Sequence, residues 1–118
     1  MNTLKFQNPT FNNGNLNYTV RLGDKHAGLG IGETVLLAKP NGELLHMATI
    51  ESVIKCQLWN IPAVVMDKEH DERCRTLAGL QKILSDVYSL DGLHKRSGGL
   101  AHLIVTCIGF TPHGREGR

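Results

Sequence analysis

The sequence predicts a mainly β fold with short helices (α+β), arranged as an antiparallel β-barrel with a helix covering one end. Several segments alternate apolar and polar residues, which is typical of strands. At most two short helices are indicated, and strands do not alternate regularly with helices, as a parallel sheet would require. Antiparallel strands in a chain of 118 residues can remove their exposed edges by closing on themselves, which predicts a barrel.

The first strong strand pattern lies at residues 17–22. A weak strand around Leu4 and Phe6 and a turn-rich stretch, 7–15, precede it. Its apolar residues would face the core: Tyr18, Val20 and Leu22. Its polar residues would share the opposite face: Asn17, Thr19 and Arg21. An amide, a hydroxyl and a guanidinium in one row suit an anion or a planar base, although the same row also fits a solvated outer face.

A loop, a hairpin and a long strand are predicted next. Residues 23–32 are rich in glycine and lack periodicity, which indicates a loop. Residues 33–39 are almost continuously apolar and predict a strand. Asn41 and Gly42 then supply a hairpin turn, because both residue types tolerate a positive φ. The return strand, 43–56, is long enough to bend and to pair on two sides.

The second half of the chain predicts one clear helix and a closing strand. Residues 59–70 fit either a short helix or a strand. Residues 77–88 carry apolar side chains at helical spacing, with Thr76 as the N-cap. A polar loop, 89–101, leads to the closing strand, 102–110.

The composition indicates one globular domain, residues 1–111, followed by a flexible tail, residues 112–118. Hydrophobic residues make up 41% and charged residues 20%, which argues against disorder. The net charge of +2 is too small to indicate nucleic-acid binding by itself. No apolar run predicts a membrane span, no signal segment is recognised, and three cysteines are an odd number for a disulfide framework, so we expect a cytoplasmic protein.

Other candidate sites carry weaker patterns. Histidines and cysteines lack the spacing of a metal site, so neither a metal nor a cofactor is expected. The glycine-rich segment 28–32 lacks the Lys-Ser/Thr ending of a phosphate loop, and Cys74 is interpreted as an ordinary surface cysteine. The mixed-charge run 67–73 is typical of a solvated face, although one of its carboxylates would suit a general base beside a pocket. Lys95 and Arg96 predict a basic loop, which is typical of a solvated surface but would also suit contact with a phosphate backbone.

Residues 14–21, Gly-Asn-Leu-Asn-Tyr-Thr-Val-Arg, resemble the N-terminal signature of the ASCH domain, Gly-x-Lys-x-x-Thr-x-Arg. Residues 32–37 resemble the family's next element, a Gly-acid turn leading into a hydrophobic strand, and the later helix and strand occur in the family's order. The relatives that this suggests are small bacterial N4-acetylcytidine amidohydrolases. The resemblance implies a PUA-like pseudo-barrel, a fold associated with RNA binding, and a cleft beside the signature strand that takes RNA or a nucleoside.

The sequence departs from the signature at one position that matters for chemistry. Catalytic members use a Lys-Thr-Glu set, and Leu16 stands where the lysine would be, although Thr19 and Arg21 match. A leucine cannot act as a nucleophile, a base or a cation. The resemblance therefore implies Thr19 and Glu72 as catalytic candidates, with Glu69 as the second choice for the glutamate.

Two functions are therefore expected from different classes. The first is an ASCH-like domain that binds RNA or a nucleoside without the family's catalysis, through six residues: Asn17, Thr19, Arg21, Lys25, Lys95 and Arg96. The alternative is an amidohydrolase that releases acetate from N4-acetylcytidine or a related nucleoside, with Lys5, Lys25 or an activated water in place of the missing amine. A module that binds another protein and no small ligand is a third interpretation.

Overall fold

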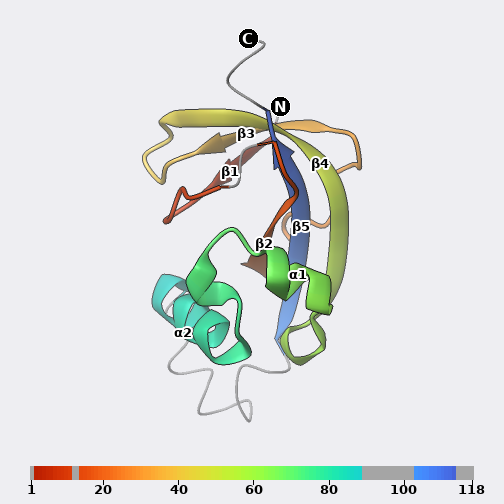
Figure 1. The fold of residues 1–118 in the computed structure, drawn as a ribbon, viewed down its shortest axis with the longest axis vertical. Coiled ribbons are helices and arrows are strands. Elements are labelled where there is room, and N and C mark those ends of the chain that lie inside the picture. Colours follow the sequence, from red (N-terminus) through yellow and green to blue (C-terminus); the bar gives the residue numbers. More distant parts are fainter. Residues whose placement is uncertain (1, 12–13, 89–102, 114–118) are drawn as a thin grey trace.

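A computed structural model describes residues 2–11, 14–88 and 103–113 of the chain (Figure 1). The strands are β1 (Thr3–Lys5), β2 (Asn17–Leu22), β3 (Thr34–Ala38), β4 (Leu44–Gln57) and β5 (Ile104–Pro112). The helices are α1 (Ala63–Lys68) and α2 (Leu77–Tyr88), and each follows a short 3-10 turn, η1 (Leu58–Asn60) or η2 (Glu72–Cys74). The predicted α+β class, mainly β with short helices, is confirmed.

The described strands form one open sheet, in the order β1-β3-β4-β5-β2. Three neighbouring pairs are antiparallel, but β1 lies parallel to β3. Edge strands β1 and β2 are not hydrogen-bonded to each other, so the predicted closed, fully antiparallel barrel is wrong. The sheet nevertheless bends far enough to bring its two edges close, because the Arg21 guanidinium of β2 lies 4.5 Å from the ring centroid of Phe6, just after β1.

The barrel does not close because another segment occupies the outer edge of β2. The backbone after α1 runs beside β2, and Glu69 bridges Tyr18 in parallel. The His70 N–H donates to the Tyr18 carbonyl at 2.8 Å, and the Glu69 carboxylate accepts the Val20 N–H at 3.0 Å. Strand β1 has three residues, too few to compete for that edge.

Strand β4 serves two pairings, as predicted. Its first half pairs with β3 and its second half with β5, and register shifts occur at Leu37/Ala38 and at Ile50/Ser52. Such bulges bend a strand and increase its twist, which lets one strand cross from one part of the sheet to the other. The hairpin before β4 also forms as expected, with Gly42 at a φ of +92° and its N–H donating to the Lys39 carbonyl.

The sheet is buried on both faces, by two clusters of apolar side chains. The helix-side cluster packs β2 and β5 against the helices and comprises Tyr18, Val20, Leu58, Val65, Cys74, Leu80, Leu84, Val105 and Cys107. The inner cluster fills the concave side of the sheet and comprises Leu4, Phe6, Leu29, Val35, Leu37, Ala48, Ile50, Ile108 and Phe110. Tyr18 and Val20 thus face the core as predicted, while the polar side of β2 is covered as well: Asn17 is 0% and Thr19 4% exposed.

The region between β4 and α2 contains η1, α1 and η2. The ambiguous segment 59–70 adopts η1 and α1 rather than a strand. Thr76 caps α2, because its hydroxyl accepts the N–H of Gly79 at 3.1 Å, and this prediction is confirmed. Gly79 also allows α2 to approach η2 closely, since a Cβ at this position would overlap the Arg73 carbonyl oxygen.

The end of the closing strand differs from the expectation. Strand β5 continues to Pro112, whose carbonyl accepts the N–H of Gly14, and the His113 N–H donates to the Met47 carbonyl. Backbone hydrogen bonds thus connect residues 112 and 113, the first two of the predicted tail, to the sheet. Residues 114–118 lie outside the described part of the chain.

Gly79→Ala is expected to destabilise the protein by about 1–3 kcal/mol, although alanine is intrinsically the better helix former. The added methyl group would collide with backbone of η2 and not with a movable side chain. Chemical denaturation measures the effect, with Gly28→Ala as the matched control because a Cβ there meets nothing within 4 Å. A Gly79→Ala protein at least as stable as the wild type would contradict this packing.

Candidate functional site

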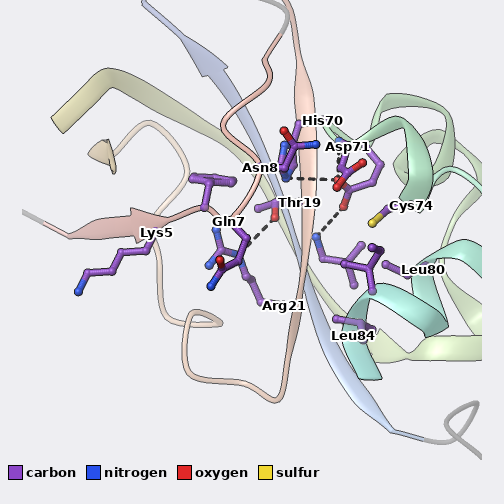
Figure 2. A pocket seen from close by; sticks show the side chains of 14 residues that line it. Lys5, Gln7, Asn8, Thr19, Arg21, His70, Asp71, Cys74, Leu80 and Leu84 are labelled. Carbon is purple, nitrogen blue, oxygen red and sulfur yellow. Dashed lines mark hydrogen bonds and ion pairs between the residues drawn. The ribbon is translucent and has the colours of Figure 1, made fainter. Parts of the chain in front are cut away.

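A pocket of about 90 Å³ opens at the seam where the barrel fails to close (Figure 2). Its wall comes from four parts of the chain: the segment after β1, strand β2, the segment after α1, and α2 with η2. The polar and aromatic lining residues include Phe6, Asn8, Thr19, Arg21, Glu69, His70 and Asp71. The apolar lining residues include Cys74, Leu80, Ile83 and Leu84. The pocket is therefore polar on the strand side and apolar on the α2 side.

Arg21 supplies the cation on the strand side of the pocket. Its Nε donates to the Thr19 hydroxyl at 3.2 Å, two residues earlier on the same face of β2. Its guanidinium also lies over the Phe6 ring, which favours a cation through the ring's negative face. These two contacts orient the guanidinium within the pocket wall before any ligand arrives.

Glu69 places a buried carboxyl in the same wall, with 2% of its surface exposed. Its Oε2 accepts the Val20 N–H and its Oε1 accepts the Asp71 N–H, each at 3.0 Å. Burial raises the pKa of Glu69 to about 7, against the opposing effect of these two hydrogen bonds. The carboxyl therefore changes its protonation near neutral pH, where a general acid or base is most useful.

His70 lies beside Glu69 and is held as a neutral imidazole. Its Nδ1 is 3.1 Å from the Thr10 carbonyl oxygen, and its ring packs edge-on against Phe6 with centroids 4.9 Å apart. Its Nε2 is 3.4 Å from Oε1 of Glu69. Burial lowers the pKa of His70 to about 4, so the ring carries no charge at pH 7.

Asp71 is ionised and fixes the turn that follows the pocket. Its carboxylate accepts the backbone N–H of Arg73 at 3.0 Å and two guanidinium N–H groups of the same residue at 3.1 and 2.8 Å. The Arg73 side chain is the main reason why the pKa of Asp71 falls to about 2. This bidentate pair locks η2 in place, and η2 in turn carries Cys74 into the pocket wall.

A wider hollow of about 480 Å³ adjoins the pocket, and we call it the outer groove. It shares Asn8, His70 and Asp71 with the inner pocket. Its other lining residues are Thr10, Phe11, Glu72, Arg73 and Arg75. Arg75 is held from behind, since its Nε donates to the Glu69 carbonyl at 3.0 Å. The inner pocket and the outer groove thus form one continuous recess with a narrow inner part and a wider outer part.

The structure brings together only some of the residues proposed for ligand binding. Thr19 and Arg21 line the inner pocket. Asn17 is fully buried and donates to the Asn15 carbonyl at 3.0 Å, and exposed Lys25 lines neither hollow. Lys95 and Arg96 lie outside the described residues.

The residues proposed for catalysis are also divided. Thr19 lines the pocket together with Glu69, the second choice, whereas Glu72 is exposed and lines the outer groove. Leu16 packs against the helix-side cluster and does not line the pocket. Lys5 lines the pocket rim but extends away from Thr19 (Figure 2).

Sequence reasoning missed two features of the site. His70 and Asp71 belong to the charged run that looked like a solvated face, and nothing in the local pattern distinguishes its buried members from its exposed ones. Cys74, interpreted as a surface cysteine between two arginines, is buried because η2 turns it towards α2. Burial raises the pKa of its thiol to about 12, which excludes a reactive thiolate at neutral pH.

The described residues contain neither a metal-binding cluster nor a membrane-spanning helix. Within residues 2–11, 14–88 and 103–113, no three His, Cys, Asp or Glu side chains gather in a way that could hold a metal ion. Across the same part of the chain, every helix is too short or too polar to cross a bilayer.

No model of a known protein family matches the sequence, and no curated protein matches it. Among solved structures, the chain is similar to the high-resolution crystal structure of an ASCH domain from Lactobacillus crispatus JV V101, with a TM-score of 0.57 and 16% sequence identity. The match covers 84% of this chain and 65% of that chain, so this chain spans just under two thirds of its neighbour's length. At this identity the likeness concerns the fold alone, and it supports the fold of an ASCH domain for this chain.

Asp71→Asn is expected to lower the free energy of unfolding by about 1–2 kcal/mol at neutral pH, because it removes charge-assisted hydrogen bonds to a partly exposed arginine. The pKa of Asp71 falls from 3.8 to about 2 on folding, so its stabilisation is present above pH 3.8 and is lost as the pH falls towards 2. The difference between variant and wild type should therefore be smaller at about pH 3 than at about pH 6. Denaturation at both pH values measures it, and exposed Asp67→Asn, from the same charged run, should show no such loss.

Proposed function

We propose that this ASCH-fold domain binds RNA or a nucleoside in the inner pocket and outer groove, without the lysine-dependent hydrolysis of catalytic relatives. The observation that carries the proposal is the position of Arg21 and Thr19. These two signature residues line the same pocket as a buried carboxyl, Glu69, and a neutral imidazole, His70. The set offers hydrogen-bond donors and acceptors beside an aromatic ring, Phe6.

The chemistry of the inner pocket suits the edge of a nucleobase. A base is a flat ring with apolar faces and an edge of hydrogen-bonding groups, and RNA-binding proteins read such edges when the base is unstacked. Here Arg21 and Thr19 would contact the edge, while Leu80 and Ile83 would contact apolar parts of the ring. Since ligand pockets commonly measure about 300–1,000 Å³, 90 Å³ holds only part of a nucleoside.

The outer groove would then take the sugar and the backbone. It continues directly from the inner pocket through His70 and Asp71, and two arginines, Arg73 and Arg75, line it. Guanidinium groups are well suited to phosphate oxygens, and such contacts position a nucleic acid without reading its sequence. Lys25, Lys95 and Arg96 remain proposed as further backbone contacts, with Asn17 supporting the strand that carries the site.

The second candidate is the amidohydrolase that releases acetate from N4-acetylcytidine or a related nucleoside. It is favoured by Glu69, whose pKa of about 7 suits general acid–base catalysis, and by the adjacent Thr19 hydroxyl. Among the described residues, the amine that lines the pocket is that of Lys5, which extends away from Thr19, whereas Leu16 packs against the helix-side cluster. Glu69 replaces Glu72 as the glutamate that we propose for this reaction.

Arg21→Ala is expected to weaken binding about 10- to 100-fold, the usual cost of losing a hydrogen bond from a charged group. Fluorescence anisotropy with short single-stranded RNAs and calorimetry with the four ribonucleosides measure the change. Lys55→Ala is the matched control, because it removes one positive charge from a residue that lines neither hollow. If Arg21→Ala is folded and its affinity equals that of the wild type, the site is not the binding site.

Wild-type protein is expected to leave N4-acetylcytidine intact, because Leu16 stands at the position of the signature lysine and the Lys5 amine extends away from Thr19. Conversion to cytidine, followed by liquid chromatography, tests this, with Leu16→Lys as the variant that restores the signature and Leu16→Met as the control for a change of side-chain shape. Activity in Leu16→Lys alone would support loss of catalysis through this substitution. Turnover by the wild type, abolished by Glu69→Gln, would favour the amidohydrolase instead.

A further inference from the structure

Glu69 and His70 form a contact that recognition of a ligand by Arg21 does not require. The two side chains are adjacent in sequence and almost fully buried, with 3% and 8% of their side-chain surfaces exposed. Both line the inner pocket, and Nε2 of His70 lies 3.4 Å from Oε1 of Glu69. An acid and an imidazole at this distance can influence each other's protonation.

The hydrogen bonds of His70 determine which of its nitrogens carries the proton. A carbonyl oxygen only accepts, so the contact between Nδ1 and the Thr10 carbonyl requires a proton on Nδ1. The neutral ring then has a lone pair on Nε2, the nitrogen that lies 3.4 Å from Oε1 of Glu69. The ring cannot turn to avoid this, because Phe6 and Phe11 pack against it with centroids 4.9 and 5.4 Å away.

The hydrogen bonds of Glu69 restrict it in the same way. Its two oxygens are held by the N–H groups of Val20 and Asp71, so the carboxyl cannot rotate away from the ring. An ionised carboxylate opposite a lone pair is unfavourable, whereas a protonated carboxyl donates to it. The arrangement therefore favours one proton, bound to Oε1 of Glu69 on the side of His70 Nε2.

We propose that Glu69 and His70 hold this one proton as a neutral pair in the pocket wall, and that His70 is the positioning residue that keeps the acid protonated. The inference rests on the proposed function in one respect, which is that the pocket receives a nucleobase or an RNA. While the pair is neutral, Glu69 adds no negative charge beside the Arg21 guanidinium. When Glu69 loses the proton, its negative charge offsets Arg21 and repels acceptor-rich or anionic ligand groups.

Other charges around the pair agree with a transition near neutral pH. The titratable or charged groups that act on it from the neighbouring elements are Arg21, Asp71, Arg75, Cys74 and Cys107. Both thiols stay neutral because burial raises their pKa, Asp71 is ionised and paired with Arg73, and the arginines keep their charge. Glu69, with a pKa of about 7, is thus the group that titrates between pH 6 and 8, and binding should weaken about five- to tenfold over that interval.

The first test uses the ligand-free protein and does not depend on any ligand. NMR of ¹⁵N-histidine and ¹³C-carboxyl labels is expected to show His70 as the Nδ1–H tautomer, uncharged down to about pH 5, and Glu69 titrating near pH 7. His70→Gln and Glu69→Gln assign the two signals by their loss. If His70 carries its proton on Nε2, or titrates near pH 6.5 like a free histidine, the shared proton is excluded.

A pair of substitutions at His70 separates positioning from simple packing. In His70→Asn the amide can still donate to the Thr10 carbonyl, but no acceptor remains opposite Glu69, so the Glu69 midpoint should fall by about one pH unit. In His70→Gln the amide oxygen can occupy the place of Nε2, and the midpoint should stay closer to that of the wild type. Equal midpoints in wild type and His70→Asn would overturn the positioning role.

The last arm measures the affinity of a short single-stranded RNA between pH 6 and 8. The expected five- to tenfold weakening should disappear in Glu69→Gln, whose amide does not ionise, and should persist in Lys55→Ala. RNA binding that is independent of pH, with His70 titrating normally, refutes the shared proton and leaves the binding function intact. If no RNA binds at any pH, the proposed function fails, and the NMR experiment still decides whether the proton is shared.

Discussion

The buried outer edge of β2 is the constraint on which the site depends. A backbone N–H or C=O that is removed from water must find a partner, and the second edge strand of the sheet does not reach this one. The chain after α1 supplies the partners instead: the N–H of His70 for the Tyr18 carbonyl and the carboxyl of Glu69 for the Val20 N–H. A side chain thus replaces one rung of a β-ladder, which keeps the sheet open and brings an acid and an imidazole to the seam.

The electrostatics of the pocket follow from that replacement. Because Glu69 completes the backbone pairing of β2, it is buried where an ionised carboxyl is costly, and the proton is retained to near neutral pH. Asp71, two residues later, is ionised instead, because the guanidinium of Arg73 donates two hydrogen bonds to its carboxylate. Two acids of one short segment therefore differ in average charge at pH 7, and Arg21 supplies a cation on the β2 side of the inner pocket.

Local features of this fold could be predicted from the sequence, and long-range ones could not. The turn at Gly42 and the cap at Thr76 depend on neighbouring residues, so their patterns are readable, as is the alternation that points Thr19 and Arg21 to one side of β2. Whether the barrel closes depends on which distant segment pairs with the outer edge of β2. The periodicity of apolar residues along the sequence does not indicate that pairing. The burial of Glu69 could not be predicted either. Its segment is irregular, so no sequence pattern distinguishes buried Glu69 from exposed Glu72.

Leu16 and Glu69 are connected through the apolar wall of the pocket. Leu16 packs against the cluster that contains Cys74 and Leu80, and these two residues also line the pocket. A lysine at this position, as in the ASCH signature, would start from that wall, and its ammonium would favour the ionised form of a nearby carboxyl. Leucine carries no charge and extends the helix-side cluster instead, so the side chain at position 16 does not favour the ionised form of Glu69. The pocket therefore presents the Glu69 carboxyl, with a pKa of about 7, beside the Arg21 guanidinium, and the side chain at position 16 adds no charge to either.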